Sequence, residues 1–238
     1  MNAYNDLTTL KSRLDITVTT HDTALLALLV AASRQIDELC NRFFYVDSAT
    51  RYFDGAGSVI FLDDLLAVTT FKLDEDGDAT YEVTMAIGDY VLYPLNKMPK
   101  IYAKISSDSN YGGFASGVRK GVEIAGNFGY GDGRSATPYH ASGDTVQDAG
   151  GLTATQTTIT VTSGGNFSAG QTIRIESEQI YIKSISSNTL TVDRACNGTT
   201  GATHAKDTAI SIYDYPAPVE EAALIQAMRW WKRRETAF

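Results

Sequence analysis

The sequence predicts an α+β protein, in which a small helical bundle with an antiparallel β-sheet and hairpins is interrupted by an inserted all-β domain. Three observations lead to this prediction. Apolar residues recur at helical spacing in residues 19–44 and 219–235. Short runs of alternating apolar and polar residues, typical of strands, fill residues 51–125. Thr, Ser, Gly and Ala then dominate residues 131–213, where no helical period is found.

The longest helical pattern covers residues 19–44 and forms the expected core of the protein. Its apolar stripe consists of Leu25, Leu28, Leu29, Ala32, Ile36, Leu39, Cys40 and Phe43. These positions are three or four residues apart, so they share one face of a helix. Arg34, Asp37 and Glu38 fall mostly on the opposite side, which we expect to be in contact with water. A shorter amphipathic helix is expected over residues 5–16.

The pattern changes to strands after residue 44. The expected strands are residues 51–62, read as a hairpin around Asp54-Gly55, and residues 66–73, 89–93, 100–105 and 121–125. Between the last two, residues 106–117 are polar and rich in Gly. This segment is predicted to be a mobile loop that becomes ordered on assembly, with Tyr111 and Phe114 making contacts between subunits.

An acidic turn follows the strand at residues 66–73. Asp74, Asp76 and Asp78 alternate there, as calcium ligands do. An EF-hand needs Gly at its sixth position and Glu at its twelfth, and this turn has Ala79 and Met85. A solvated turn is therefore the favoured interpretation.

The Thr- and Ser-rich segment predicts the inserted domain. Its expected strands are residues 157–162, 171–175, 179–185 and 189–192, separated by Gly- and Ser-rich turns. We expect residues 134–213 to form this domain, and residues 1–133 and 214–238 to form the domain that it interrupts.

Composition excludes several classes of protein. The formal net charge is −8, so the chain as a whole lacks the basic footprint of a DNA-binding protein. The apolar run at residues 24–32 is too short to cross a bilayer, and no basic segment of a signal peptide precedes it. The protein is expected to stay in the cytosol where it is made. Cys40 and Cys196 are interpreted as free thiols, and a disulfide between them is the less favoured alternative.

Residues with catalytic spacing are scarce. His21, His140 and His204 lie in separate segments without metal-ligand spacing. No nucleophile elbow, phosphate loop or dinucleotide fingerprint occurs. Glu176 and Glu178 are candidates for a carboxylate pair, although a solvated hairpin face explains them equally well. We therefore expect no enzymatic activity, and no catalytic, metal-binding or cofactor-binding residues.

The helix at residues 219–235 ends in the chain's one concentrated basic cluster. The cluster and the aromatic residues beside it are Arg229, Trp230, Trp231, Lys232, Arg233, Arg234 and Phe238. Cations at a helix C-terminus match the helix dipole, which is one interpretation. The other is an anchor on an acidic partner, because Trp and Arg dominate interface hot spots.

The order of these segments resembles the head–tail connector, or head-completion adaptor, proteins of tailed bacteriophages. The resemblance rests on Leu10-Lys-Ser-Arg-Leu14, residues 22–43, Arg51-Tyr-Phe-Asp-Gly55, Tyr93-Pro-Leu-Asn-Lys-Met-Pro99, Gly126-Asn-Phe-Gly-Tyr130, Pro218-Val-Glu-Glu-Ala222 and Arg229-Trp-Trp-Lys-Arg233. Each motif alone is weakly specific, so the resemblance depends on their order. One departure is the long segment between Tyr130 and Pro216, which in the family is short.

The resemblance implies a structural virion protein located in the phage neck and made in the bacterial cytoplasm. Such proteins form a ring of identical subunits, usually about twelve, below the portal protein. A downstream stopper or tail protein binds the other side, and genomic DNA passes through the channel without specific binding. The basic cluster would then bind the portal, and Arg34, Asp37, Glu38, Tyr111 and Phe114 would lie between subunits. The alternative is a virion binding module whose β insert recognises a glycan or another virion protein.

Overall fold

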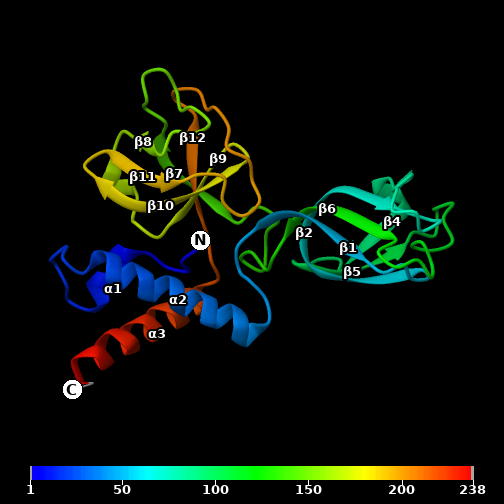
Figure 1. The fold of residues 1–238 in the computed structure, drawn as a ribbon, viewed down its shortest axis with the longest axis horizontal. Coiled ribbons are helices and arrows are strands. Elements are labelled where there is room, and N and C mark those ends of the chain that lie inside the picture. Colours follow the sequence, from blue (N-terminus) through cyan, green and yellow to red (C-terminus); the bar gives the residue numbers. More distant parts are fainter. Residues whose placement is uncertain (1, 237–238) are drawn as a thin grey trace. The chain divides into compact units, whose positions relative to one another are not determined.

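The computed structural model describes the backbone of residues 2–236 and the side chains of residues 2–233. It contains two antiparallel β-sheets of six strands each and three α-helices (Figure 1). The chain forms two compact units. Residues 45–137 make up the sheet unit, and residues 1–44 together with 138–238 make up the barrel unit.

The predicted fold class is wrong. The molecule is mostly β, with strands in both units, and it is not a small helical bundle with a β insert. The helical pattern over residues 19–44 predicted too long a helix, because the α-helix there, α2, spans only Asp22–Cys40. The patterns also missed two strands of the barrel unit, at 139–145 and 209–213. Residues 139–145 are mostly polar or small and leave a weak period-2 signal, which explains the first omission. Residues 209–213 do alternate, with Ile210 and Ile212 buried, so the second strand could have been found.

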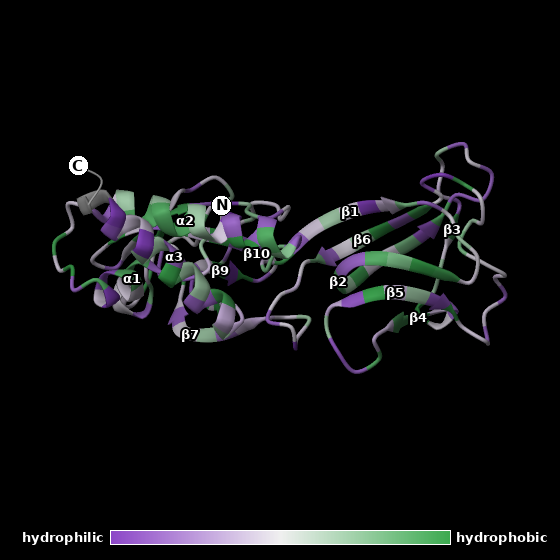
Figure 2. Cartoon of the chain, turned by 90° about the horizontal axis from the view of Figure 1, so that it is seen from below, coloured by the Kyte–Doolittle hydropathy of each residue, from purple (hydrophilic) through white to green (hydrophobic). Residues whose placement is uncertain are grey.

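The sheet unit has the strand order β1-β6-β2-β5-β4, with β3 paired to β2 (Figure 2). Its strands are β1 (Asp47–Phe53), β2 (Val59–Leu73), β3 (Val83–Thr84), β4 (Tyr90–Tyr93), β5 (Lys100–Ile105) and β6 (Val122–Phe128). A 3-10 turn, η1 (Ile87–Asp89), precedes β4. Burial alternates along β6 because each of its inward-facing residues packs into the core of the sheet.

The expected hairpin around Asp54-Gly55 does not form. β1 and β2 are not neighbours, because β6 lies between them: Ile124 pairs with Arg51 of β1 on one side and with Phe71 of β2 on the other. Asp54-Gly55 does mark the end of a strand, since β1 ends at Phe53. Local turn chemistry cannot say which distant strand enters between two consecutive ones.

The six strands of the barrel unit follow the order β7-β12-β9-β10-β11-β8. They are β7 (Tyr139–Thr145), β8 (Thr158–Thr160), β9 (Thr172–Ile175), β10 (Glu178–Ser186), β11 (Thr189–Asp193) and β12 (Ala209–Tyr213). A short 3-10 turn, η2 (Gly164–Asn166), follows β8. An antiparallel bridge between Val146, just after β7, and Val161, just after β8, joins the two edges of the sheet. The sheet is therefore closed into a small barrel.

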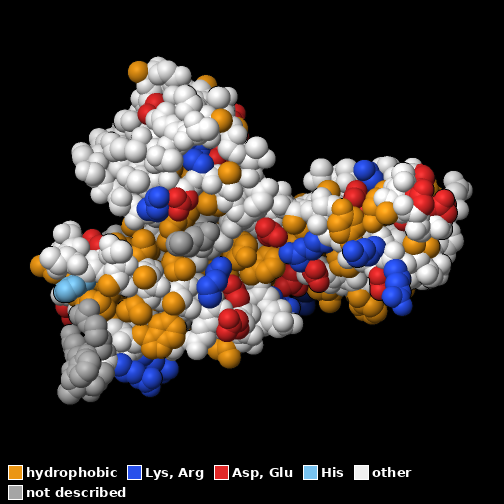
Figure 3. Space-filling model, in the orientation of Figure 1, with side chains coloured by type: hydrophobic (Ala, Val, Ile, Leu, Met, Phe, Trp, Pro, Cys, Tyr) orange, Lys and Arg blue, Asp and Glu red, His pale blue; other side chains and the backbone are white. Residues whose placement is uncertain are grey.

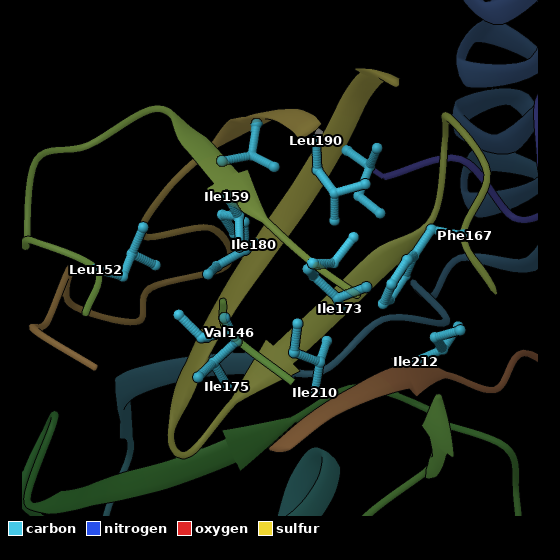
Figure 4. Close-up of a cluster of buried hydrophobic side chains, with 13 residues drawn as sticks. Val146, Leu152, Ile159, Phe167, Ile173, Ile175, Ile180, Leu190, Ile210 and Ile212 are labelled. Carbon is cyan, nitrogen blue, oxygen red and sulfur yellow. The ribbon is translucent and has the colours of Figure 1, made fainter. Parts of the chain in front are cut away.

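The barrel interior is filled by aliphatic side chains that point toward one another (Figure 4). The cluster consists of Val146, Leu152, Ile159, Val161, Phe167, Ile173, Ile175, Ile180, Ile182, Leu190, Val192, Ile210 and Ile212. Isoleucine and valine suit this position because their β-branched side chains pack well on a pleated surface.

Three helices belong to the barrel unit: α1 (Leu7–Arg13), α2 (Asp22–Cys40) and α3 (Ala217–Thr236). Asp6 caps α1 by accepting a hydrogen bond of 2.9 Å from the backbone N–H of Thr9. Asn41 ends α2 in the left-handed conformation, with φ of 48°. The N-cap residue of α2 is His21, which makes no side-chain capping bond.

The predicted stripe of α2 is correct only in its first part. Leu25, Leu29 and Ala32 are buried, whereas Leu39 is 80% exposed and Cys40 is also exposed. Burial requires a facing element, so within the barrel unit the side chains of Leu39 and Cys40 do not pack into the core. Both cysteines are free thiols, as expected.

The helices pack with the barrel rather than with the preceding sheet. The N–H of Leu7 donates to the carbonyl of Ala169 at 2.8 Å, and the hydroxyls of Thr8 and Ser168 are 2.7 Å apart. The helical residues were expected to form one domain with the first sheet. These contacts place them in one compact unit with the barrel, while the independent folding of residues 134–213 stays a prediction. In the part of the chain that the structure describes, none of the helices is apolar over a length that would cross a bilayer.

Candidate functional site

The end of α3 combines a buried stripe with an exposed basic face. Val219, Ala223, Ala227 and Trp231 are buried at spacings of four, so they hold the helix against the rest of the barrel unit. The Trp231 ring meets the His21 ring edge-on, with the two ring centroids 5.2 Å apart. Trp231 is therefore part of the core, and its expected role as an apolar anchor for a partner is wrong.

The basic residues of this helix end do reach solvent. Arg229, Lys232 and Arg233 are exposed, and Trp230 is partly buried. In Figure 3 blue Lys or Arg atoms lie at the edge of the region of α3, beside orange hydrophobic atoms. The side chains of Arg234 and Phe238, which were also expected to bind a partner, lie outside the described residues.

The polar side of α2 is less exposed than the sequence predicted, and its place between subunits stays a prediction. The guanidinium of Arg34 lies 3.1 Å from Asp37 and 5.2 Å from the centre of the Tyr4 ring, so it packs within its own subunit. Asp37 accepts a hydrogen bond from the buried Tyr4 hydroxyl. Burial raises the pKa of Asp37, although the bond from Tyr4 and the charge of Arg34 oppose this. Glu38 alone of the three predicted residues is exposed.

Tyr4 is the centre of an aromatic cluster that fixes Phe44, the last residue of the N-terminal part of the barrel unit. The backbone N–H of Phe44 donates to the Tyr4 hydroxyl at 2.9 Å, and the Tyr213 hydroxyl donates to the Phe44 carbonyl at 2.8 Å. The rings of Tyr4 and Tyr215 are 4.8 Å apart, and those of Tyr213 and Tyr215 are 4.4 Å apart. Both backbone groups of Phe44 are thus paired, as buried polar groups must be.

The loop at residues 106–117 is anchored in its own subunit. Phe114 is completely buried, and its ring stacks on Phe71 with centroids 5.5 Å apart. Its backbone exchanges hydrogen bonds with Ala56 at 2.8 and 3.0 Å. Phe114 is therefore a core residue, which corrects its predicted place between subunits. Tyr111 is partly buried.

Glu178 of β10 is a carboxylate whose side chain is fully buried and surrounded by hydrogen-bond donors. One carboxylate oxygen accepts from Arg194 Nε at 2.7 Å and from the N–H of Ala195 at 3.0 Å. The other accepts from Arg194 Nη2 at 2.7 Å, from the N–H of Ala202 at 3.0 Å and from His204 Nε2 at 2.9 Å. Burial alone would raise the pKa of Glu178, but these hydrogen bonds outweigh it and lower the pKa to about 2.

Arg194 and His204 extend this cluster to the neighbouring loops. Arg194 also donates to the carbonyls of Thr153 and Gln156 at 2.8 and 3.0 Å. His204 Nδ1 lies 2.7 Å from the carboxylate of Glu176. Because both ring nitrogens of His204 face carboxylates, both contacts are hydrogen bonds only when the ring carries two protons.

The geometry of this cluster is that of a structural support. A general base needs a free lone pair directed at a substrate, and the five donors around Glu178 occupy its oxygens. Sequence reasoning considered Glu176 and Glu178 as a pair, and the structure separates their roles: Glu176 is 61% exposed, and Glu178 is the buried centre. The sequence signal that could have found Glu178 is its position at the start of a strand, shortly before the apolar run Ile180-Tyr-Ile182.

The acidic turn after β2 also has a structural explanation. Carboxylate oxygens of Asp74, Asp76, Asp78 and Glu82 lie within 4.8 Å of one another. Asp74 is buried and accepts hydrogen bonds from the backbone N–H groups of Gly77 at 2.7 Å and Ala79 at 2.9 Å. Its carboxylate therefore stabilises the turn. The expected solvated turn is correct only for Asp76, Asp78 and Glu82, which are exposed, because Asp74 is buried.

A row of aromatic side chains crosses the outer face of the sheet unit. Phe61 of β2 and Tyr93 of β4 both pair with Tyr102 of β5, so the three residues lie side by side on adjacent strands. The Tyr93 and Tyr102 rings stack at 5.0 Å, and Phe61 is 78% exposed. Lys104 Nζ lies 5.4 Å from the Tyr93 ring. We call Phe61, Tyr93 and Tyr102 the aromatic row.

Comparison with known proteins yields no relative. No family model, curated protein or solved structure matches this chain.

Proposed function

We propose that this protein is a structural subunit of a tailed-phage virion, a head–tail connector that forms a ring under the portal and extends the DNA channel toward the tail. Its partners would be further copies of the chain, the portal protein, and a downstream stopper or tail protein. The proposal rests on the order of the sequence motifs together with one surface feature, the aromatic row, in which Phe61 is exposed and the two tyrosines are partly exposed.

The aromatic row is the observation that carries an assembly function. A large aromatic side chain that remains mostly exposed loses the free energy it would gain by burial, roughly 1.5–3 kcal/mol for a Phe. Exposed apolar surface of this kind marks sites where another protein binds. Tyr93 and Tyr102 lie in the regular β4–β5 ladder and Phe61 lies at the end of a regular stretch of the β2–β5 ladder, so strand pairing limits the freedom that the rings would lose when a partner buries them.

The motifs that carry the resemblance occupy surfaces as well as core. Tyr93-Pro-Leu-Asn-Lys-Met-Pro99 begins at the aromatic row and continues into a loop in which Leu95 is exposed. Arg229-Trp-Trp-Lys-Arg233 supplies the exposed cations of α3. We assign the first surface to contact between subunits and the second to the portal.

The aromatic row can be tested by one substitution. Phe61→Ser should leave the subunit folded, because Phe61 is mostly exposed, but should reduce assembly roughly tenfold or more, as for an interface hot spot. Sedimentation and electron microscopy of the protein mixed with portal rings would measure the assembled fraction. Ile87→Ser is the matched control, since Ile87 is 88% exposed but lies outside the row. Wild-type assembly by Phe61→Ser would contradict the proposal, as would a wild-type protein that stays monomeric and binds only a glycan.

The basic face of α3 makes a second, separable prediction. Arg229→Glu combined with Lys232→Glu should leave a folded subunit that no longer docks on portal-bearing heads, and wild-type docking should weaken as salt is raised. Arg119→Glu combined with Lys120→Glu changes the charge equally at two exposed residues of the sheet unit and should dock normally. Normal docking by the α3 variant would mean that its cations serve only the helix dipole.

A further inference from the structure

The sheet unit has one long open edge. β1 (Asp47–Phe53) pairs with β6 through seven consecutive residue pairs without a bulge, and it is the first strand of the sheet order (Figure 2). Alternate backbone groups of such an edge strand point away from the sheet and can pair with another extended chain. Natural proteins usually protect such an edge with Pro, Lys, a bulge or a very short strand.

The other edge of the sheet is protected in this way. β4 has only four residues and is followed directly by Pro94, which cannot donate a backbone hydrogen bond. β1 contains no Pro, Gly or Lys and is nearly twice as long. The two edges therefore differ in their capacity to accept a strand.

Arg51 is the basic residue of β1, but its side chain does not point toward the open edge and so does not protect it. The guanidinium of Arg51 lies 4.3 Å from the centre of the Phe128 ring on β6 and 2.7 Å from Asp63 on β2. The side chain thus leans back across the sheet, away from the open edge. Its charge is already compensated by Asp63 and by Asp47.

We propose that β1 pairs antiparallel with β1 of a second copy of this chain, about a two-fold axis at Thr50. In this register all seven residues are paired. Thr50, which is exposed, faces Thr50 of the partner, and Ser48 faces the half-exposed Tyr52. Thr–Thr pairs are favourable across antiparallel strands, and this register places no like charges directly opposite each other.

This contact is separate from the proposed ring. A two-fold contact joins two copies and offers no further free surface of the same kind. It therefore produces dimers and does not itself build a ring. The inference rests on the edge geometry of β1 and does not depend on the phage assignment. Failure of one proposal would leave the other standing, because their tests use different surfaces.

Cysteine cross-linking tests both the pairing and its register. In a Cys40→Ser background, Thr50→Cys should form a disulfide-linked dimer on mild oxidation, because directly opposite residues are within disulfide reach. Ser48→Cys alone should not, since the two copies of residue 48 would be about 14 Å apart at 3.4 Å per residue. A mixture of Ser48→Cys and Tyr52→Cys proteins should again form the linked dimer. Denaturing gels read these products whether or not rings are present.

A second set of variants shows whether the link reports a specific contact. Adding Thr50→Lys to both proteins of the Ser48→Cys and Tyr52→Cys mixture places two like charges opposite each other and should reduce the linked dimer at least tenfold. Thr50→Ser is the control and should leave it unchanged. Both variants should melt like the parent protein, since Thr50 is exposed. Cross-linking of Thr50→Cys no faster than that of Ser48→Cys, or an undiminished dimer with Thr50→Lys, would overturn the proposal.

Discussion

Replacing Glu178 by alanine is expected to lower the free energy of unfolding of the barrel unit by roughly 3–5 kcal/mol, the cost of breaking a buried ion pair. The substitution leaves Arg194 as a buried charge without its carboxylate, and it removes the acceptor for the backbone N–H groups of Ala195 and Ala202. The segments at residues 153–156 and 194–202, which Arg194 and Glu178 hold together, would lose their common anchor. Urea denaturation, followed by circular dichroism, measures the change.

Glu176→Ala provides the matched control. Its carboxylate contacts the same histidine but is 61% exposed, so its loss should cost less than about 1 kcal/mol. Equal destabilisation by the two substitutions would show that the cluster is not centred on Glu178.

The same residue makes a prediction about pH. The pKa of Glu178 is lowered from 4.5 to about 2 in the folded protein, so the unfolded chain binds its proton first as the pH falls. The stabilisation is therefore fully present above about pH 4.5 and is lost as the pH falls from there toward 2. Glu178→Gln cannot titrate, so its stability should change less over this interval than that of the wild type. Parallel pH profiles for the two proteins would contradict the assignment.

Phe114→Ala is expected to destabilise the sheet unit by roughly 3–5 kcal/mol, the usual cost of truncating a buried phenylalanine. Phe114 has no exposed surface and stacks on Phe71, so its removal leaves a cavity at the centre of the sheet. Tyr111→Ala, at a partly buried position of the same loop, should cost less than half as much. Thermal denaturation of both variants measures the difference.

Limited proteolysis of the free protein checks the same conclusion. If Phe114 anchors the loop, residues 106–117 resist cleavage in the wild type and become sensitive in Phe114→Ala. Rapid cleavage of the wild-type loop would instead support the prediction made from its polar composition, in which it is ordered only on assembly.

Local patterns determined the elements whose signals lie within a few residues. The spacing of Leu25, Leu29 and Ala32 predicted the buried face of α2, because residues three and four apart share a helix face. The strand at Lys100–Ile105 was predicted with its observed bounds, because it alternates and follows Pro99. The basic end of α3 was also evident in the sequence.

Only the tertiary structure shows which strands pair and which side chains are buried between the elements. Pairing of β1 with β6 joins residues far apart in the sequence, and no local turn signal specifies it. Trp231 and Phe114 looked like anchors for a partner, because an aromatic residue in a polar segment has the same composition whether it is buried or exposed. Glu178 became recognisable only when Arg194 and His204 reached it from other loops. Burial and hydrogen bonding depend on residues that are distant in the sequence and close in the fold. The closure of the barrel, the Glu178 cluster and the open edge at β1 were therefore recognisable only in the tertiary structure.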